Sequence, residues 1–147
     1  MTAGSQIIAE ARLWLGTPYL HQASVRGAGT DCLGLLRGVW RAVHGEEPEP
    51  VPVYTADWAE PSRHEVLLAA AQRWLREKPL VPAAVGDVIL FRMREGAIAK
   101  HLGLQSEVGS HQRFIHAYTG HGVIESSLST PWERRIAARF AFPEGTK

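Results

Sequence analysis

The 147-residue sequence has one cysteine, no long apolar run and almost no net charge. A single cysteine cannot form an internal disulfide or a cysteine-rich zinc site, so Cys32 is either a reactive thiol or an inert core residue. The apolar runs are far shorter than the roughly 20 residues that cross a bilayer, and no basic segment precedes an apolar one at the N-terminus. We therefore expect no export signal, no membrane partner and synthesis in the cytoplasm. The formal charge of +1 gives no reason to expect a nucleic-acid partner.

A chain of this length fits one compact domain, and we expect a single domain over residues 1–147. Its first half has helical periodicity. Apolar residues recur at helical spacing over residues 5–15, and a second helix is predicted from residue 30 or 31 to Gly45. A third helix is predicted over residues 62–77.

The second half has the pattern of β-strands. Short segments rich in Val, Ile, Phe and Tyr, separated by glycine-bearing turns, predict an antiparallel meander with strands at 86–93, 101–107, 112–119 and 122–128. The tail at 132–143 suits either a helix or a last strand, and we expect it to cap the sheet. Helices followed by strands indicate an α+β fold in which N-terminal helices pack on a C-terminal antiparallel sheet.

Cys32 follows a glycine-rich loop and falls in the first turn of the second predicted helix. Unpaired N–H groups and the positive end of the helix dipole favour a thiolate at that position. The alternative is that Cys32 packs as a small buried hydrophobe, as free cysteines often do. A neighbouring base would decide between the two readings.

Two of the seven histidines, His101 and His116, lie within predicted strands and are flanked by apolar residues. If a hairpin over residues 108–111 has an even number of loop residues, His101 is opposite His116 or Tyr118, and both histidines lie on one face of the sheet. An odd loop would separate them. A shared face turned toward the helix that carries Cys32 would supply a nucleophile, a base and an orienting group in series.

This arrangement predicts specific geometry. We expect the Cys32 sulfur within hydrogen-bond reach of a ring nitrogen of His101, with His116 on the far side of that ring. Gly103 lies on the same strand face as His101, and its missing side chain would leave room for a substrate.

The motifs GTPY, DCLGLLRGVW, GDVILF, HLGLQSE and FIHAY, which span most of the chain, resemble those of the NlpC family of cell-wall cysteine peptidases. Their spacing and the tail WERRIAARFAFP are most similar to the small phage and gene-transfer-agent branch. The resemblance implies a papain-like fold in which Cys32 is the nucleophile, His101 the base and acid, and His116 the orienting residue. We expect no cofactor and no metal.

The same resemblance implies a peptidoglycan stem peptide as the substrate, cleaved between γ-D-glutamate and a diamino acid. Tyr19 and Asp31 match positions that line the substrate site, where the aspartate helps to recognise a free amino end. Cys32 N–H and Tyr19 would contribute to the oxyanion hole. Leu33 departs from the serine found in many family members. The implied partners are phage-tail or transfer-agent particle proteins, and the implied destinations are the virion or the cell wall.

A few sequence features could indicate other functions. The run GAGTDC has no following Gly-Lys-Ser/Thr, so it is a weak phosphate-loop signal. The histidines at 111, 116 and 121 are five residues apart, a spacing that alternates faces in a strand and argues against a catalytic metal. An amidase or acyltransferase acting on another substrate and a non-catalytic tail-assembly protein with the same fold remain open.

Overall fold

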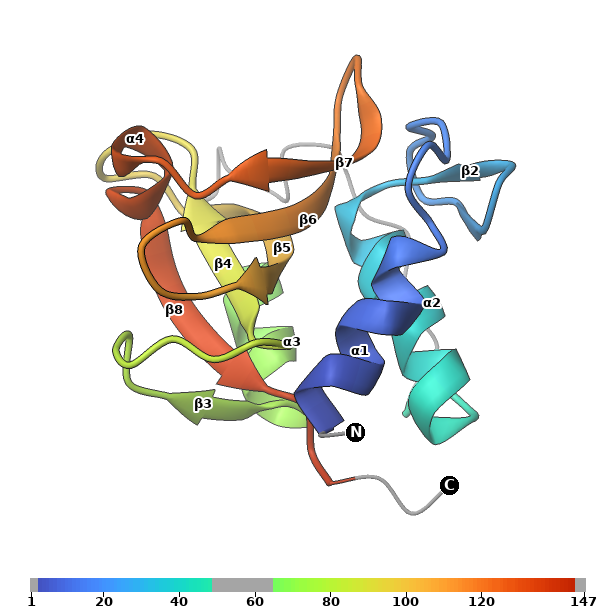
Figure 1. The fold of residues 1–147 in the computed structure, drawn as a ribbon, viewed down its shortest axis with the longest axis horizontal. Coiled ribbons are helices and arrows are strands. Elements are labelled where there is room, and N and C mark those ends of the chain that lie inside the picture. The colour runs from blue at the N-terminus through green and yellow to red at the C-terminus, as the bar shows by residue number, and fades with distance from the viewer. Residues whose placement is uncertain (1–2, 49–64, 145–147) are drawn as a thin grey trace.

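A computed structural model describes residues 3–48 and 65–144, and the fold is of the predicted α+β class (Figure 1). The helices are α1 (Ala3–Arg12), α2 (Cys32–His44), α3 (Val66–Trp74) and the single turn α4 (Thr130–Glu133). The strands are β1 (Ser24–Val25), β2 (Gly29–Thr30), β3 (Arg76–Lys78), β4 (Val88–Arg92), β5 (Ala99–Glu107), β6 (Arg113–Tyr118), β7 (Gly122–Ser127) and β8 (Ile136–Ala141).

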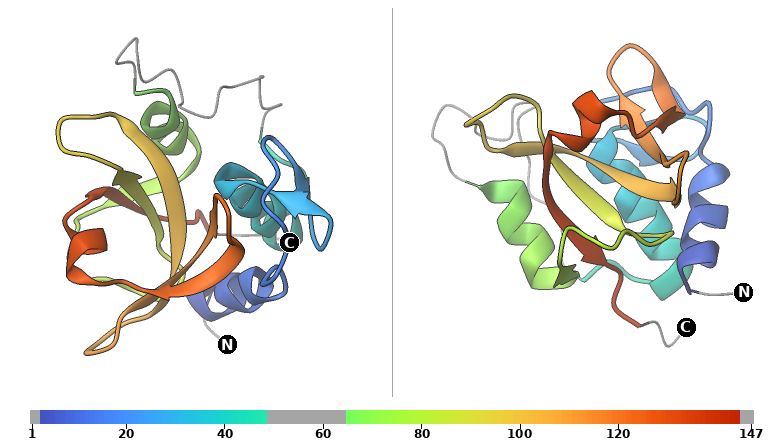
Figure 2. Two further views of the ribbon diagram at one scale, coloured as in Figure 1. Left: turned by 90° about the horizontal axis from the view of Figure 1, so that it is seen from above. Right: turned by 60° about the vertical axis from the view of Figure 1, so that its left-hand side comes forward.

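Helices α1 and α2 lie side by side on one flank of a curved antiparallel sheet (Figures 1 and 2). The sheet has the strand order β3-β8-β4-β5-β6-β7, so β4 to β7 form the predicted meander. The expectation that the tail caps the sheet is wrong, whereas the alternative of a last strand is confirmed. After the turn α4 it returns as β8 and pairs with both β3 and β4, which places Ala138 and Phe140 in the core.

The helices differ from the sequence prediction mainly at their ends. Helix α2 agrees with it, beginning at Cys32 and ending before Gly45. Helix α1 ends at Arg12, because the N–H groups of residues 13–15 bond three residues back and tighten the chain into a different turn. Residues 62–64 of the third predicted helix lie outside the described part, and residues 76–78 form β3 instead of continuing that helix.

Apolar side chains form two clusters, one on each face of the sheet. The main core lies between the helices and the sheet and includes Cys32, Leu102 and Ile115. A smaller cluster on the other face is built around Phe91 and Phe114. Because residues of a strand alternate between faces, His101 and His116 lie on the same face as the smaller cluster and contact its rings.

A buried group of charged and polar side chains joins strands β3, β5 and β8. Asp87, the aspartate of the GDVILF motif, accepts hydrogen bonds from Arg139 Nη1 at 3.0 Å and Lys78 Nζ at 2.9 Å. Arg139 also donates to the Gln105 side chain at 2.8 Å. Buried charges need such paired partners, so this group stabilises the sheet on which the histidines lie.

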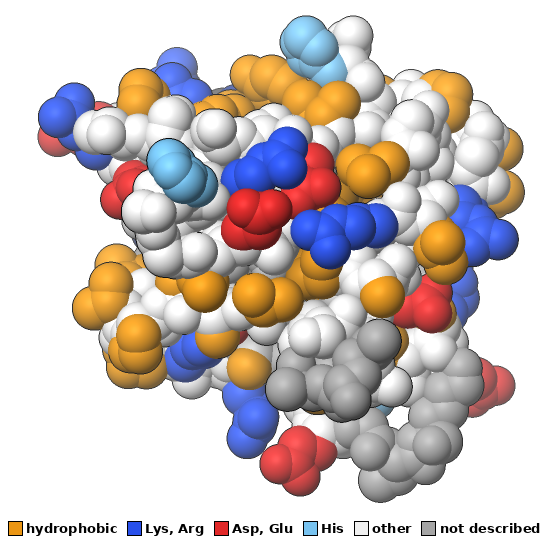
Figure 3. Space-filling view, viewed as in Figure 1, with side chains coloured by type: hydrophobic (Ala, Val, Ile, Leu, Met, Phe, Trp, Pro, Cys, Tyr) orange, Lys and Arg blue, Asp and Glu red, His pale blue; other side chains and the backbone are white. Residues whose placement is uncertain are grey.

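The surface carries charges of both signs. Lys and Arg side chains are interspersed with Asp and Glu on the face shown in Figure 3. One of the ion pairs, Arg12 with Glu125 at 3.1 Å, joins α1 to β7. Within the described residues, no helix is both long and apolar enough to cross a membrane.

Candidate active site

The start of α2 is fixed by Asp31, which is 2% exposed and caps the helix. Its Oδ1 accepts a hydrogen bond from Gly34 N at 2.8 Å, and its Oδ2 accepts one from Gln22 N at 2.7 Å. Gln22 has a φ of 66°, a conformation that costs free energy for a residue with a side chain. The loop before Cys32 is therefore held onto the first turn of the helix by one carboxylate.

Gly34 allows the loop to approach the helix this closely. A Cβ at this position would overlap the carbonyl oxygen of Ala23 and lie 2.5 Å from the Thr30 hydroxyl oxygen. The Ser24 hydroxyl, in the same loop, donates to the carbonyl oxygen of Gly34 at 2.6 Å. The glycine two residues after Cys32 is thus required by backbone packing.

Tyr19 is brought beside Cys32 by a short stretch of parallel pairing. Tyr19 bridges to Thr30, with Thr30 N donating to Pro18 O and Leu20 N donating to Thr30 O, both at 3.0 Å. Burial raises the pKa of the Tyr19 hydroxyl, while a hydrogen bond with Thr119 opposes the rise. Tyr19 therefore keeps its proton at neutral pH and can donate a hydrogen bond.

Cys32 is 6% exposed and belongs to the main core, yet it also lines a cavity. Burial raises the pKa of its thiol to about 12, and the negative charge of Asp31 adds to the rise. Backbone N–H groups, including its own and that of Leu102, lower this pKa but do not outweigh burial. The backbone N–H groups at the helix start favour the thiolate, as predicted, but burial outweighs them, so a base is needed to take the proton.

His101 and His116 lie on one face of the sheet, as predicted, but for a different reason. The loop between β5 and β6 has five residues, 108–112, an odd number that would separate the two histidines in an unbroken hairpin. A bulge between Gln105 and Glu107 shifts the register by one residue. Beyond this bulge, from Gln105 toward His101, the shifted pairing of β5 with β6 places both histidines on the same face of the sheet.

The two imidazoles are in direct contact. His101 Nε2 and His116 Nδ1 are 2.8 Å apart, and His116 Nε2 is 3.0 Å from Ser126 Oγ. Burial, followed by the charge of His116, lowers the pKa of His101 to about 3. Burial, followed by His121, lowers the pKa of His116 to about 4. Both rings are therefore neutral at pH 7 and available as bases.

Aromatic rings pack against this pair. Trp132 of α4 lies with its ring centroid 5.7 Å from that of His101 and 5.3 Å from that of His116. Phe91 lies 5.8 Å from His101, and Phe114 lies 4.2 Å from His116. The apolar rings explain why burial dominates the histidine pKa values.

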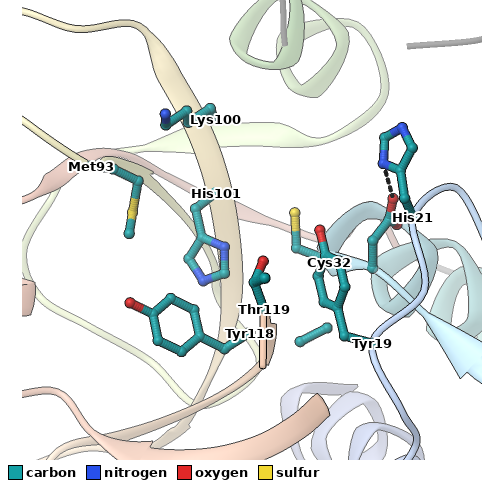
Figure 4. A pocket seen from close by; sticks show the side chains of 10 residues that line it. Tyr19, His21, Cys32, Met93, Lys100, His101, Tyr118 and Thr119 are labelled. Atoms are coloured by element: carbon teal, nitrogen blue, oxygen red, sulfur yellow. Dashed lines mark ion pairs between the residues drawn. The ribbon is translucent and has the colours of Figure 1, made fainter. Parts of the chain in front are cut away.

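A cavity of about 200 Å³ joins the Cys32 thiol to His101. Cys32, His101, Tyr19 and Asp31 all line it, and Figure 4 shows the Cys32 sulfur and the His101 ring on opposite sides of the same space. His116 lies behind His101, as predicted. Among the hydrogen bonds of the described residues none joins Cys32 to His101, so the expected direct bond is absent from this structure.

Gly103 does not leave room for a substrate. A Cβ on Gly103 would lie 2.7 Å from the Phe114 ring and 3.3 Å from the His116 Cβ. The space beside this glycine is already filled by the neighbouring strand. The sequence interpretation is wrong here, because a missing side chain indicates a close approach without telling which group approaches.

Three residues that the sequence interpretation did not select also belong to the site. His21, in the loop before β1, lines the cavity with its Nδ1 3.7 Å from Asp31 Oδ2. Ser126 and Trp132 contact the histidine pair from β7 and α4. Alternation along 122–128 could have placed Ser126 on the histidine face, whereas no pattern in the sequence pointed to Trp132.

The arrangement suits nucleophilic chemistry more than metal chemistry. Within residues 3–48 and 65–144, no group of three or more His, Cys, Asp and Glu side chains could hold a metal ion. A thiol and a neutral imidazole lining one cavity, with a second imidazole behind the first, have the composition of an acyl-transfer site. Tyr19 and the first turn of α2 supply donors to the same space.

Two curated proteins are similar to this chain in sequence. The murein DD-endopeptidase MepS/murein LD-carboxypeptidase of Escherichia coli strain K12 is 30% identical over 132 residues, which are 89% of this chain and 58% of that protein. The gamma-DL-glutamyl hydrolase of Bacillus subtilis strain 168 is 27% identical over 138 residues, 92% of this chain and 28% of that protein. The chain thus spans little more than half of the first relative and a smaller part of the second.

Solved structures show the same fold. The NlpC/p60 domain of the peptidoglycan hydrolase SagA matches with a TM-score of 0.66 and 20% identity over 96% of this chain and 100% of that one. An NlpC/P60 family protein from Bacillus cereus ATCC 10987 also gives 0.66, with 21% identity over 96% of this chain and 40% of that one. The fold is the papain-like one expected from the sequence. Residues 16–139 match the NlpC/P60 family as a whole, and the chain belongs to that family.

Proposed function

We propose that the protein is a cysteine peptidase that hydrolyses an amide bond in the stem peptides of peptidoglycan. The observation that carries the proposal is one cavity lined by Cys32 and His101, with His101 hydrogen-bonded at 2.8 Å to His116. The named relatives act on murein or on a glutamyl linkage, which supports this class of substrate.

The reaction begins with both groups neutral. His101 takes the thiol proton as the Cys32 sulfur bonds to the carbonyl carbon, and His116 stabilises the imidazolium that forms. The Cys32 N–H and the Tyr19 hydroxyl donate to the developing oxyanion. His101 then gives its proton to the leaving amine as the C–N bond breaks, and a thioester remains on Cys32.

Water completes the cycle. His101 removes a proton from a water molecule that attacks the thioester carbonyl, and the thiol leaves and recovers its proton through His101. His101 therefore serves as base and acid in turn. This requires its neutral form at the start of each half-reaction, which its low pKa provides.

For the bond, we propose the link between γ-D-glutamate and the diamino acid. The name of the Bacillus subtilis relative supports a glutamyl linkage, whereas the name of the Escherichia coli relative refers to other linkages. Asp31 faces the cavity and supports recognition of a free amino end, although its oxygens already accept from two backbone N–H groups. Leu33 in place of a serine leaves this recognition with one polar group fewer.

We propose that residues 1–147 act as one catalytic domain associated with a phage or gene-transfer-agent particle. The similarity of the segment 132–143 to that branch supports this association. Copurification of the protein with particles, followed by mass spectrometry of the particles, tests it. Detection only in the particle-free fraction would contradict it.

Mass spectrometry of defined muropeptides tests the activity. Wild type is expected to cleave a tripeptide or tetrapeptide stem after γ-D-glutamate, and Cys32→Ala is expected to leave it intact. Equal cleavage by both proteins would contradict thiol chemistry. Cleavage by neither would favour a non-catalytic assembly role, and acyl transfer to an added amine in place of hydrolysis would favour an acyltransferase.

A further inference from the structure

Ser126 of β7 extends the line of hydrogen-bonded groups that starts at His101. Its Oγ lies 3.0 Å from His116 Nε2, and His116 Nδ1 lies 2.8 Å from His101 Nε2. In the pairing of β6 with β7, Ser126 is opposite Phe114, which makes it a diagonal neighbour of His116 on the same face. The strand register therefore delivers a hydroxyl to the outer nitrogen of His116.

Two arrangements of protons satisfy this line, because each neutral imidazole has one N–H and one lone pair. In the first, His101 Nε2–H donates to His116, and His116 Nε2–H donates to Ser126. In the second, every donor and acceptor is reversed. Only the first leaves the lone pair of His101 Nδ1 free to accept the proton of Cys32.

The first arrangement also suits the charged state of the reaction. When His101 has taken the thiol proton, both of its nitrogens carry hydrogen, so His116 Nδ1 must be an acceptor. His116 Nε2–H then needs an acceptor of its own on the far side. Ser126 Oγ is the acceptor within hydrogen-bond distance among the described residues.

We propose that Ser126 is a positioning residue that accepts from His116 Nε2–H and so holds both histidines in the tautomers that make His101 a base. The proposal rests on the peptidase function proposed above. Ser126 acts through His116 and His101 and is not one of the residues that line the cavity. It adds a fourth member to the Cys32, His101 and His116 series.

The first test is ¹⁵N NMR of the imidazole rings in the free wild-type protein. The expected result is protonation at Nε2 in both His101 and His116. Protonation of His116 at Nδ1 would overturn the proposal. This measurement needs neither substrate nor a variant, so it stands whatever the muropeptide assay shows.

The second test is the rate at which iodoacetamide alkylates Cys32, the only thiol of the chain. Ser126→Ala is expected to slow alkylation about fivefold, the effect of losing one hydrogen bond, and to give a mixture of His116 tautomers. Ser126→Thr, which keeps the hydroxyl, should stay within about twofold of wild type. An unchanged rate and tautomer in Ser126→Ala would overturn the proposal.

Ser127 provides the matched control. It follows Ser126 in β7, is exposed, pairs with Arg113 and points to the other face of the sheet. Ser127→Ala should leave the alkylation rate and both tautomers unchanged. An equal slowing in Ser126→Ala and Ser127→Ala would show a general effect on the strand and overturn the specific role of Ser126.

Discussion

The two walls of the cavity are built in different ways. The thiol wall, residues 19–34, comes from one continuous stretch in which Asp31, Gly34 and a two-stranded turn hold Cys32 by local contacts. The histidine wall, His101 with His116, Ser126 and Trp132, is assembled from β5, β6, β7 and α4 by strand register. Local backbone chemistry fixes the first wall, and long-range packing fixes the second.

Because the two walls are built differently, mutations in each wall should affect the protein in different ways. A mutation in the thiol wall strains or loosens a backbone turn, so its main effect should be on the stability of the fold. A change in the histidine wall alters proton affinity and should alter the reaction first. The neutral thiol and the neutral imidazole are inactive alone, so the site depends on the distance that the fold sets between the walls.

The largest effect is expected from His101→Ala. Loss of the general base should slow muropeptide cleavage about 10³-fold, while the protein remains folded. His111→Ala is the control, because His111 is an exposed histidine in the β5–β6 loop and should leave the rate unchanged. Steady-state rates measured by liquid chromatography check both, and a loss smaller than about tenfold would contradict the role of His101.

Wild type and His101→Ala should also differ in their stability at acid pH. His101 and His116 have pKa values well below the usual 6.5, so the unfolded chain binds protons that the folded chain does not bind above pH 3 to 4. The free energy of unfolding of wild type should therefore fall as the pH drops from about 6.5 to 3. Urea titrations should show a shallower fall for His101→Ala, and parallel curves would speak against buried neutral histidines.

Gly34→Ala is expected to damage the thiol wall through stability. The added methyl group overlaps the Ala23 carbonyl oxygen, so the loop or the first turn of α2 must shift, at a cost of about 1–3 kcal/mol or more. Gly120→Ala is a matched control, because its Cβ would enter open space and would meet only the strain of a positive φ. Equal destabilisation of the two variants, measured by urea unfolding, would show that close approach at Gly34 matters little.

Trp132→Ala should shift the pH dependence of the reaction. Removing the ring admits water to His101 and His116, reduces the cost of charging them and raises both pKa values toward 6.5. Because the reaction needs a neutral His101, the acid limb of kcat/KM should move to higher pH by about one unit. Trp132→Phe keeps an aromatic cover and should shift less, and an unmoved limb in Trp132→Ala would exclude this shielding role.

Among these variants, Asp31→Asn is expected to change the reactivity of the site least. Unlike the others, it should make Cys32 more reactive. Removing the negative charge should lower the pKa of Cys32 and speed its alkylation a few-fold at pH 8. An amide can still accept from Gly34 N but cannot also accept from Gln22 N, so stability should fall by about 1 kcal/mol. Slower alkylation would show that Asp31 assists the thiol instead of opposing its ionisation.

The sequence predicted the thiol wall more securely than the histidine wall. The bounds of α2 follow from Asp31 and Gly45, which are local signals, and the motif around Cys32 is equally local. The prediction that His101 and His116 share a face assumed a loop with an even number of residues. The loop has an odd number, and the bulge near Gln105 restores the register. Bulges leave little trace in composition, so the conclusion depended on a feature that periodicity does not reveal.

Other outcomes depended on three-dimensional surroundings. Burial outweighs the helix dipole at Cys32, and the extent of burial follows from packing that residues 26–40 alone do not determine. Gly103 faces Phe114 and not a substrate, and Trp132 reaches the histidines only because α4 folds back before β8. Sequence patterns located the chemical groups, and tertiary packing set their protonation states.

A double-mutant cycle of muropeptide cleavage measures whether the two walls act as one catalytic unit. Rates are compared for wild type, Cys32→Ala, His101→Ala and the double variant. Residues that act together are non-additive, so the double variant should be no slower than Cys32→Ala alone. A double variant slowed by the product of the two single effects would show that Cys32 and His101 act independently.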